Sequence, residues 1–201
     1  MKNINIPVII DEMNVIHQLH RINVHGLSWT SFYKTLSYYA NSNVIPYFAC
    51  ANVESQEKVI HSNRTTFFNA LRERGVNVLE GFAVKASKNH RIEKGVDVLV
   101  ALQIYKEALK GARDIIVCSA DSDLVPAVKE AQDMGVRVHV VMSDYTPGCE
   151  LSTIADRVIS LETVVQSMLE RGKVRFKDQE RPYLFTDAEC YKQLRKGLLY
   201  A

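Results

Sequence analysis

The sequence predicts an α/β fold in which helices cover both faces of a parallel β-sheet. Runs of β-branched, apolar residues recur along the chain, and each run is continuous rather than alternating with polar residues. Continuous runs are typical of strands that are buried on both faces. Segments with helical periodicity separate these runs, which is the order of a sheet built from strand–helix–strand crossovers. The crossovers are expected to be right-handed.

Six strands and five helices are expected. The strands lie at Ile6–Ile10, Val44–Ala49, Val76–Leu79, Asp114–Cys118, Val136–Val141 and Val158–Ser160. The helices lie at Ser28–Ala40, Glu54–Arg74, Lys94–Leu109, Ser122–Met134 and Leu161–Glu170. Ser28 is a suitable N-cap for the first helix. Gly75 and Gly135 follow the second and fourth helices, where glycine commonly ends a helix.

The chain of 201 residues is predicted to form one domain over residues 1–170 and a basic C-terminal extension over residues 171–201. The extension has eight Lys/Arg and four Asp/Glu, so its charge is +4 against +2 for the whole chain. It carries an apolar and basic helical pattern at Cys190–Leu199. Such a segment suits a polyanionic partner, docking on the domain, or a solvated terminus, and the sequence does not choose among them.

Cysteine usage and hydropathy predict a cytoplasmic protein without a membrane segment. No pair of the 4 cysteines has the C-x-x-C spacing of a zinc or redox site. Cys50 and Cys118 end apolar runs and are expected in the core. No apolar stretch approaches the length of a membrane span, and the first residues lack the pattern of a cleavable signal segment.

Acidic and amide side chains follow the first and fourth predicted strands. Asp11 and Asn14 come directly after the first strand, and Asp121 and Asp123 come after the fourth. A further acid, Asp97, lies in the first turn of the third predicted helix. In open parallel sheets, ligands bind beyond the carboxyl ends of the strands. These side chains therefore converge at one edge if the first and fourth strands are neighbours.

Carboxylates in such a cluster repel one another, so a cation is expected to hold them together. Because the set offers oxygen ligands and no His or Cys, the expected ion is Mg²⁺ or Mn²⁺. Such an ion bridges phosphate oxygens and activates water for in-line attack. Each acid also has a purely structural interpretation. Asp11 ends a strand, Asp97 is favoured by the helix dipole, and Asp121 or Asp123 starts a helix.

Four motifs, in this order, resemble the NYN domain family of the LabA/DUF88 type, within the PIN-like nuclease superfamily. They are IIDEMN at residues 9–14, KGVDV at 94–98, SADSDLVPAVKEAQDMGVRVHVV at 119–141 and LSTIADRVISL at 151–161. The resemblance covers about residues 6–165. It implies a PIN-like, Rossmann-like three-layer sandwich around a mostly parallel sheet of five or six strands. It also implies Mg²⁺- or Mn²⁺-dependent cleavage of RNA, either single-stranded or structured.

The same resemblance assigns catalytic roles to five residues, Asp11, Asn14, Asp97, Asp121 and Asp123. Its four aspartates are the expected metal ligands, with Asp123 binding directly or through water. The amide of Asn14 is expected to orient an acid or a phosphate oxygen.

Three positions depart from the family pattern. Glu12 stands where the family has Gly, Ala120 replaces the Gly of S-G-D, and Leu124 replaces Phe. Glu12 has three possible placements: it adds a ligand, crowds the pocket or points into solvent. Ala120 requires that its turn does not need a positive φ. Because the acids are intact, these changes bear on geometry and rate more than on metal binding.

Six further residues are expected to contact substrate or support the acids: Ser119, Ser122, Lys85, Lys88, Arg91 and Lys94. The two serines are hydrogen-bond donors for the carboxylates, or residues of an ordinary turn. Three of the four cations lie on a predicted loop at residues 85–91, and Lys94 follows it. They are expected to bind the phosphate backbone, or to belong to an ordinary solvated loop. His17 and His20 have the i, i+3 spacing of metal ligands, but no third ligand is apparent and surface positions are expected.

Two other functions compete with the nuclease. The segment DSDLV fits the D-x-D-x-[TV] motif of haloacid dehalogenase phosphatases, with Asp121 as nucleophile. That motif normally follows the first strand, whereas here it follows the fourth. The stronger competitor is a non-catalytic RNA-binding or regulatory module that keeps the fold. The RNA target, endo or exo cleavage and the oligomeric state are left open, although PIN-like relatives suggest a homodimer.

Overall fold

The computed structural model describes residues 5–55, 57–87, 90–146, 149–169 and 174–176, with the backbone alone for residues 86, 87, 90, 91 and 174–176. Its centre is a seven-stranded sheet with the order β5-β4-β3-β1-β6-β7-β8. The strands are β1 (Ile6–Asp11), β3 (Val44–Val53), β4 (Asn77–Ser87), β5 (His90–Lys94), β6 (Asp114–Cys118), β7 (Arg137–Met142) and β8 (Arg157–Ser160). All neighbours pair in parallel except β4 and β5. The expected α/β class with a mostly parallel sheet is confirmed.

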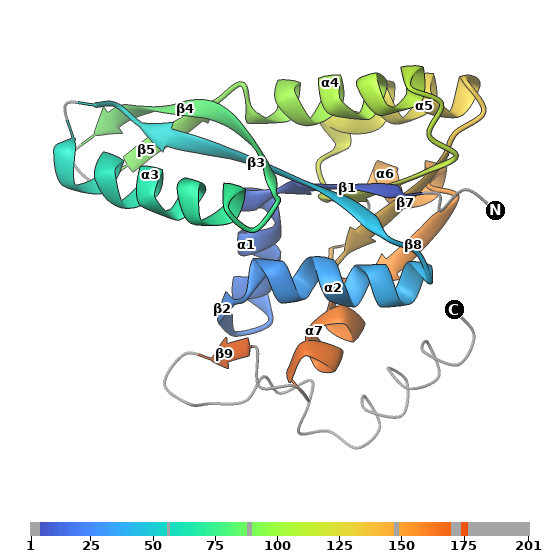
Figure 1. Cartoon of the computed structure of the whole chain (residues 1–201), viewed down its shortest axis with the longest axis horizontal. Helices are drawn as coiled ribbons and strands as arrows, with labels where there is room; N and C mark the ends of the chain where they lie inside the picture. Colours follow the sequence, from blue (N-terminus) through green and yellow to red (C-terminus); the bar gives the residue numbers. More distant parts are fainter. Residues whose placement is uncertain (1–4, 56, 88–89, 147–148, 170–173, 177–201) are drawn as a thin grey trace.

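Helices cover both faces of this sheet (Figure 1). They are α1 (Glu12–Arg21), α2 (Trp29–Ala40), α3 (Lys58–Arg72), α4 (Val96–Leu109), α5 (Val125–Asp133), α6 (Glu150–Ile154) and α7 (Leu161–Leu169), with a 3₁₀ turn η1 (Ser122–Leu124) before α5. Buried residues of α1, α2, α3 and α7 share one hydrophobic core, and those of α4, α5 and α6 share another. The sheet therefore lies between two helical layers, as a three-layer sandwich requires.

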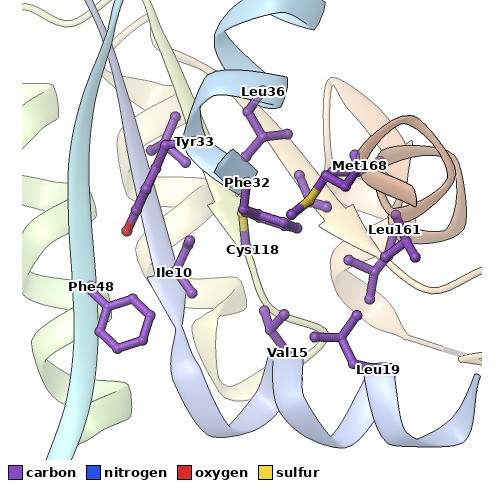
Figure 2. Close-up of a cluster of buried hydrophobic side chains, with 14 of the residues drawn as sticks. Ile10, Val15, Leu19, Phe32, Tyr33, Leu36, Phe48, Cys118, Leu161 and Met168 are labelled. Carbon is purple, nitrogen blue, oxygen red and sulfur yellow. The ribbon is translucent and has the colours of Figure 1, made fainter. Parts of the chain in front are cut away.

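Strand β1 shows why its sequence is apolar without interruption. Val8 and Ile10 belong to the core under α1 and α2, whereas Ile9 belongs to the core under α4. All three side chains are fully buried. Successive strand residues point to opposite faces, so a strand covered on both sides needs apolar residues at every position. Figure 2 shows the first core, where Ile10 lies among Phe32, Phe48 and their neighbours.

The central pairing brings the two predicted acidic segments together. β1 pairs in parallel with β6, and Ile10 is the register partner of Cys118. The next residues are Asp11 on one strand and Ser119 after the other. The condition set by the sequence, that these two strands are neighbours, is therefore met.

Several elements differ from the sequence prediction. The sheet has seven strands rather than five or six, because residues 90–94 form β5 and pair antiparallel with β4. The predicted loop at 85–91 is thus largely the end of a hairpin, and α4 begins at Val96 rather than at Lys94. Helices α1 and α6 were not predicted.

A second, two-stranded sheet was also missed. It pairs β2 (Val24–Leu27) antiparallel with β9 (Val174–Phe176). Three residues of the predicted extension therefore contact the domain, whereas the helical pattern at 190–199 lies outside the described residues. Within the described ranges, no helix combines the length and apolarity that a membrane crossing requires.

Candidate active site

A cavity of about 230 Å³ opens at the carboxyl end of β1, between α1 and the start of α4. Four acidic side chains line it: Asp11, Glu93, Asp97 and Asp121. The remaining lining residues are Met13, Asn14, His17 and Val96. We call this the acid cavity. Three of the four aspartates predicted as metal ligands meet there, and so does the predicted Asn14.

Asp11 is the most enclosed of these acids. It is the last residue of β1 and the N-cap of α1, where its Oδ1 accepts a hydrogen bond from the backbone N–H of Asn14 at 3.2 Å. Its Oδ2 accepts from the Oγ of Ser119 at 3.2 Å. Burial raises the pKa of Asp11 to about 6, against these two hydrogen bonds, and the nearby charges of Asp121 and Asp97 raise it further. A cation would favour the ionised form that burial opposes.

Asp97 and Asp121 approach the cavity from two other elements. Asp97 lies in the first turn of α4, which follows Gly95 in a left-handed conformation with φ of 76°. Asp121 caps the turn η1, where its Oδ1 accepts from the backbone N–H of Asp123 at 3.0 Å. Asp123 itself is exposed and does not line the acid cavity. The structure therefore brings Asp121, but not Asp123, to the other acids.

Glu93 is an acidic residue of the cavity that the sequence did not identify. It lies on β5, opposite Ala83 of β4. Burial raises the pKa of Glu93 to about 7, the charges of Glu12 and Asp11 add to the rise, and Arg64 and a hydrogen bond from the backbone of Ala51 oppose it. The available signal was its position directly before the KGVDV motif. The sequence analysis did not identify Glu93 because the segment around it was expected to be a loop followed by the start of a helix.

Asn14 is fixed by a network that ties α1 to two strand ends. Its Oδ1 accepts from the backbone N–H of Ala120 and from Nε2 of Gln18, both at 2.8 Å. Gln18 in turn accepts at Oε1 from the backbone N–H of Ser143, at 2.7 Å. Because Oδ1 serves both donors, the amino group of Asn14 is the part of its amide left to donate within the cavity. Gln18 was not predicted.

Glu12 does none of the three things that the sequence suggested. It is buried, with 2% of its surface exposed, and does not line the acid cavity. Glu12 forms a bidentate ion pair with Arg64 of α3. Nη1 of Arg64 donates to Oε1 of Glu12 at 2.8 Å, and Nη2 of Arg64 donates to Oε2 of Glu12. The Nη2 of Arg64 also donates to the carbonyl of Ala51 at 2.9 Å, and its guanidinium lies 4.6 Å from the Phe68 ring centre. Glu12 thus joins α1 to α3 behind the cavity.

The supporting residues divide into two groups. Ser119 is fully buried, donates to Asp11 and accepts from the backbone N–H of Asp121 at 3.2 Å, so it links the two acids. Ser122 is exposed and does not line the cavity. Ala120 does not have a positive φ. Its turn therefore meets the condition that the replacement of the family Gly by Ala requires.

Three of the four predicted cations lie on the β4–β5 hairpin, which also supplies Glu93 of the cavity. Lys85 and Lys94 are exposed, and Lys94 directly follows Glu93. Arg91 is the register partner of Lys85 in the hairpin. Lys88 lies outside the described residues.

The histidines near the cavity do not add a metal site. His17 lines the acid cavity, whereas the ring of His20 stacks on His25 with the centroids 4.5 Å apart. Among the described residues, no group of three or more His, Cys, Asp or Glu side chains is arranged to hold a metal ion.

The donor set nevertheless has the chemistry of a Mg²⁺ site. Mg²⁺ keeps several waters and is usually bound through one or two carboxylates together with substrate phosphates, rather than in a complete protein cage. Asp11, Asp97 and Asp121 offer such carboxylates around one open cavity. The residues that would hold the ion are therefore these three.

Comparison with known proteins assigns the chain to a family. The NYN domain profile matches residues 5–162. The chain belongs to the NYN domain family. This family is part of the PIN-like nuclease superfamily, so the resemblance to the NYN family is confirmed, whereas the LabA/DUF88 type stays a prediction.

A solved structure that is similar to this NYN domain shows its fold, and its description names no activity. The crystal structure of a protein of unknown function from Vibrio parahaemolyticus matches with a TM-score of 0.59 and 17% sequence identity. The match covers 80% of this chain and 95% of that one. No curated protein matches.

Proposed function

We propose that this NYN domain is a metal-dependent ribonuclease that hydrolyses RNA phosphodiester bonds at the acid cavity. The observation that carries the proposal is the convergence of Asp11, Asp97 and Asp121 on one cavity in a chain of this family. The family is nuclease-like in general, and the metal and the RNA substrate are the finer parts of the proposal.

Three acids would hold Mg²⁺ or Mn²⁺, and each is supplied by a different part of the fold. Asp11 comes from the end of β1, Asp97 from the start of α4 and Asp121 from the turn after β6. When bound, the ion supplies positive charge for the phosphate and lowers the pKa of an attacking water. Asp123, which is exposed and outside the cavity, is assigned at most an outer position through water.

Other side chains position the reacting groups. Ser119 orients the carboxylate of Asp11 through its hydroxyl. Asn14, held by Ala120 and Gln18, presents its amino group as a donor for a phosphate oxygen. The hairpin residues Lys85 and Lys94 offer positive charge to the RNA backbone, which adds affinity without reading sequence.

The test is cleavage of end-labelled RNA, with single-stranded and hairpin substrates in Mg²⁺ or Mn²⁺. Wild type is compared with Asp97→Asn and Asp121→Asn, which keep side-chain size and remove charge. Asp133→Asn is the matched control, because Asp133 is an exposed aspartate at the end of α5. We expect cleavage by wild type and Asp133→Asn, a loss of about 100-fold or more in the two cavity variants, and no cleavage with chelator.

Three results would contradict this proposal. Cleavage that is equal in wild type and in both cavity variants would come from a contaminating nuclease. RNA binding without cleavage, under all metal conditions, would favour the alternative of a non-catalytic RNA-binding module with the same fold. Phosphorylation of Asp121 by a phosphomonoester would instead identify the dehalogenase-type phosphatase.

A further inference from the structure

A second cavity, of about 560 Å³, lies at the opposite edge of the sheet from the acid cavity. Ile6 lines it at the first residue of β1, whereas Asp11 ends that strand. The length of β1, about 16 Å, therefore separates the two cavities. The amino ends of β6, β7 and β8 and the last turn of α2 complete the walls. We call this the amino-edge cavity.

The floor of the amino-edge cavity combines apolar and ionic side chains in a fixed order. Ile116, His139 and Arg157 are register partners on β6, β7 and β8. Register partners on adjacent strands point to the same face of a sheet, so these three side chains form one row. Asp114 and Arg137 form the next row. Neither row serves the acid cavity.

Asp114 is already neutralised within the floor. Its Oδ2 accepts from Nη2 of Arg137 at 2.8 Å, and its Oδ1 lies 2.8 Å from Nε2 of His139. Burial would raise the pKa of Asp114, but the hydrogen bonds from Arg137 and His139 outweigh it and the pKa is lowered. The carboxylate is therefore ionised at neutral pH, and His139 donates to it through Nε2–H.

This hydrogen bond leaves the other ring nitrogen of His139 without a partner. Nδ1 is buried and makes no hydrogen bond with any described residue. A buried polar atom without a partner costs free energy, but because Nδ1 has no accessible surface it is not a contact point for a ligand in the cavity.

The second arginine supplies charge that no acid of the described residues neutralises. Arg157 is exposed at the cavity and forms no ion pair within the described part of the chain. With Asp114 offset by Arg137, the cavity has a net positive charge. Ile6, Ile116 and Ile159 give it an apolar wall. Its volume falls in the usual range for small-molecule sites, roughly 300 to 1,000 Å³.

We propose that the amino-edge cavity binds a small organic anion that has an apolar body. The anionic group contacts Arg157, and the apolar body packs on the isoleucines. Mononucleotides combine these two features and serve as probes. This site does not depend on the proposed nuclease activity, because it shares no residue with the acid cavity.

The test is calorimetric titration of the full chain with adenosine 5′-monophosphate in the presence of chelator. Adenosine and inorganic phosphate are titrated separately, because each has only part of the required chemistry. We expect the nucleotide to bind, and each part alone to bind at least about tenfold more weakly. Arg157→Gln is expected to weaken nucleotide binding about tenfold or more, since a hydrogen bond to a charged group is lost. Arg74→Gln is the matched control, because Arg74 is exposed and does not line the amino-edge cavity.

Each outcome decides the proposal. Binding that is weakened by Arg157→Gln but unchanged in Arg74→Gln and Asp121→Asn supports it. Binding lost in Asp121→Asn and retained in Arg157→Gln would place the nucleotide in the acid cavity and overturn it. Absence of nucleotide binding at millimolar concentration would also overturn it. Circular dichroism of Arg157→Gln checks that the variant is folded.

Discussion

A single residue, Asp11, combines three roles at the end of β1. It completes the strand, caps α1 through the backbone N–H of Asn14, and lines the acid cavity. The cap and the hydrogen bond from Ser119 hold its carboxylate in place, while burial makes the charge costly. Because burial disfavours the charge on Asp11, binding of a cation beside this carboxylate would be favourable in free energy.

This arrangement predicts a pH-dependent effect of Asp11→Asn on stability. The folded-state pKa of about 6 is higher than the ordinary value of 3.8, so the folded protein binds this proton more tightly than the unfolded chain does. Ionisation therefore costs stability as pH rises from about 4 through 6. With chelator, Asp11→Asn is expected to be more stable than wild type at pH 7, by up to about 3 kcal/mol.

Urea unfolding at pH 7 and at pH 4 measures this difference. The advantage of Asp11→Asn is expected to shrink toward zero at pH 4, where wild-type Asp11 is protonated in the folded protein. Added Mg²⁺ is expected to stabilise wild type more than the variant. A gap of the same size at both pH values would show that burial does not raise the pKa of Asp11.

Glu12 and Arg64 make a second residue-scale prediction. Arg64→Met leaves the buried carboxylate of Glu12 without its partner, and we expect a loss of about 3 kcal/mol in the free energy of unfolding. Arg72→Met is the control on the same helix, because Arg72 pairs with Glu80 at the surface. Its expected loss is below about 1 kcal/mol. Urea unfolding compares the two, and similar losses would mean that the Glu12 pair is no stronger than a surface pair.

At the scale of elements, patterns in the sequence identified the buried strands and the long helices. β1 and β6 were predictable because both faces are covered, which requires continuous apolar runs. The N-cap of α2 was predictable too, since Ser28 accepts from the backbone N–H of Ser31. Asp11, Asn14, Asp97 and Asp121 were found at the cavity because each lies directly beyond a strand or at a helix start.

The missed elements are those whose sequences lack such patterns. β5 reads HRIEK and lies at the edge of the sheet, where only one neighbour is needed and charged residues are favoured. Without β5, the position of Glu93 in the cavity could not be foreseen. β2 and β9 are joined across about 150 positions, and local periodicity carries no information on such a pairing. Glu12 was misjudged because its partner Arg64 lies on a different helix.

Gly95 supports a prediction about the element that presents Asp97. Its φ of 76° is left-handed, and a Cβ at this position would meet no atom within 4 Å. Gly95→Ala therefore costs only conformational energy, about 1 kcal/mol. Gly95 directly precedes α4. If the backbone at this position rotates to relieve the strain of a positive φ, the first turn of α4 is expected to shift and to displace Asp97. We expect a loss of RNA cleavage larger than the loss of stability.

Gly111 provides the matched control for that experiment. It follows the other end of α4, has a φ of 81° and likewise meets no atom that would obstruct a Cβ. Gly111→Ala is expected to lose a similar amount of stability while RNA cleavage stays near the wild-type rate. Thermal unfolding and the cleavage assay measure the two effects. Equal loss of cleavage in both variants would mean that Gly95 acts only through stability.

At the scale of the whole molecule, the sheet separates two chemically different edges. The carboxyl edge has the acid cavity, with four acidic side chains. The amino edge has a cavity with Arg137, His139 and Arg157. β1 and β6 run between them and are buried on both faces, so they set the spacing of the two edges rigidly. Because these strands run parallel, the residues that follow them gather at one edge and the residues that begin them gather at the other.

The last prediction concerns where the folded unit ends. β9 pairs with β2, whereas all residues of the acid cavity lie between positions 11 and 121. Deletion of residues 177–201 keeps β9, and we expect an unchanged melting temperature and an unchanged stabilisation by Mn²⁺. Deletion of residues 174–201 also removes β9, and the lost strand hydrogen bonds are expected to cost about 2 kcal/mol. Thermal unfolding of both truncations, with and without Mn²⁺, distinguishes them. A large loss of stability in the shorter deletion would make residues 177–201 part of the domain, and a lost response to Mn²⁺ would tie them to the metal site.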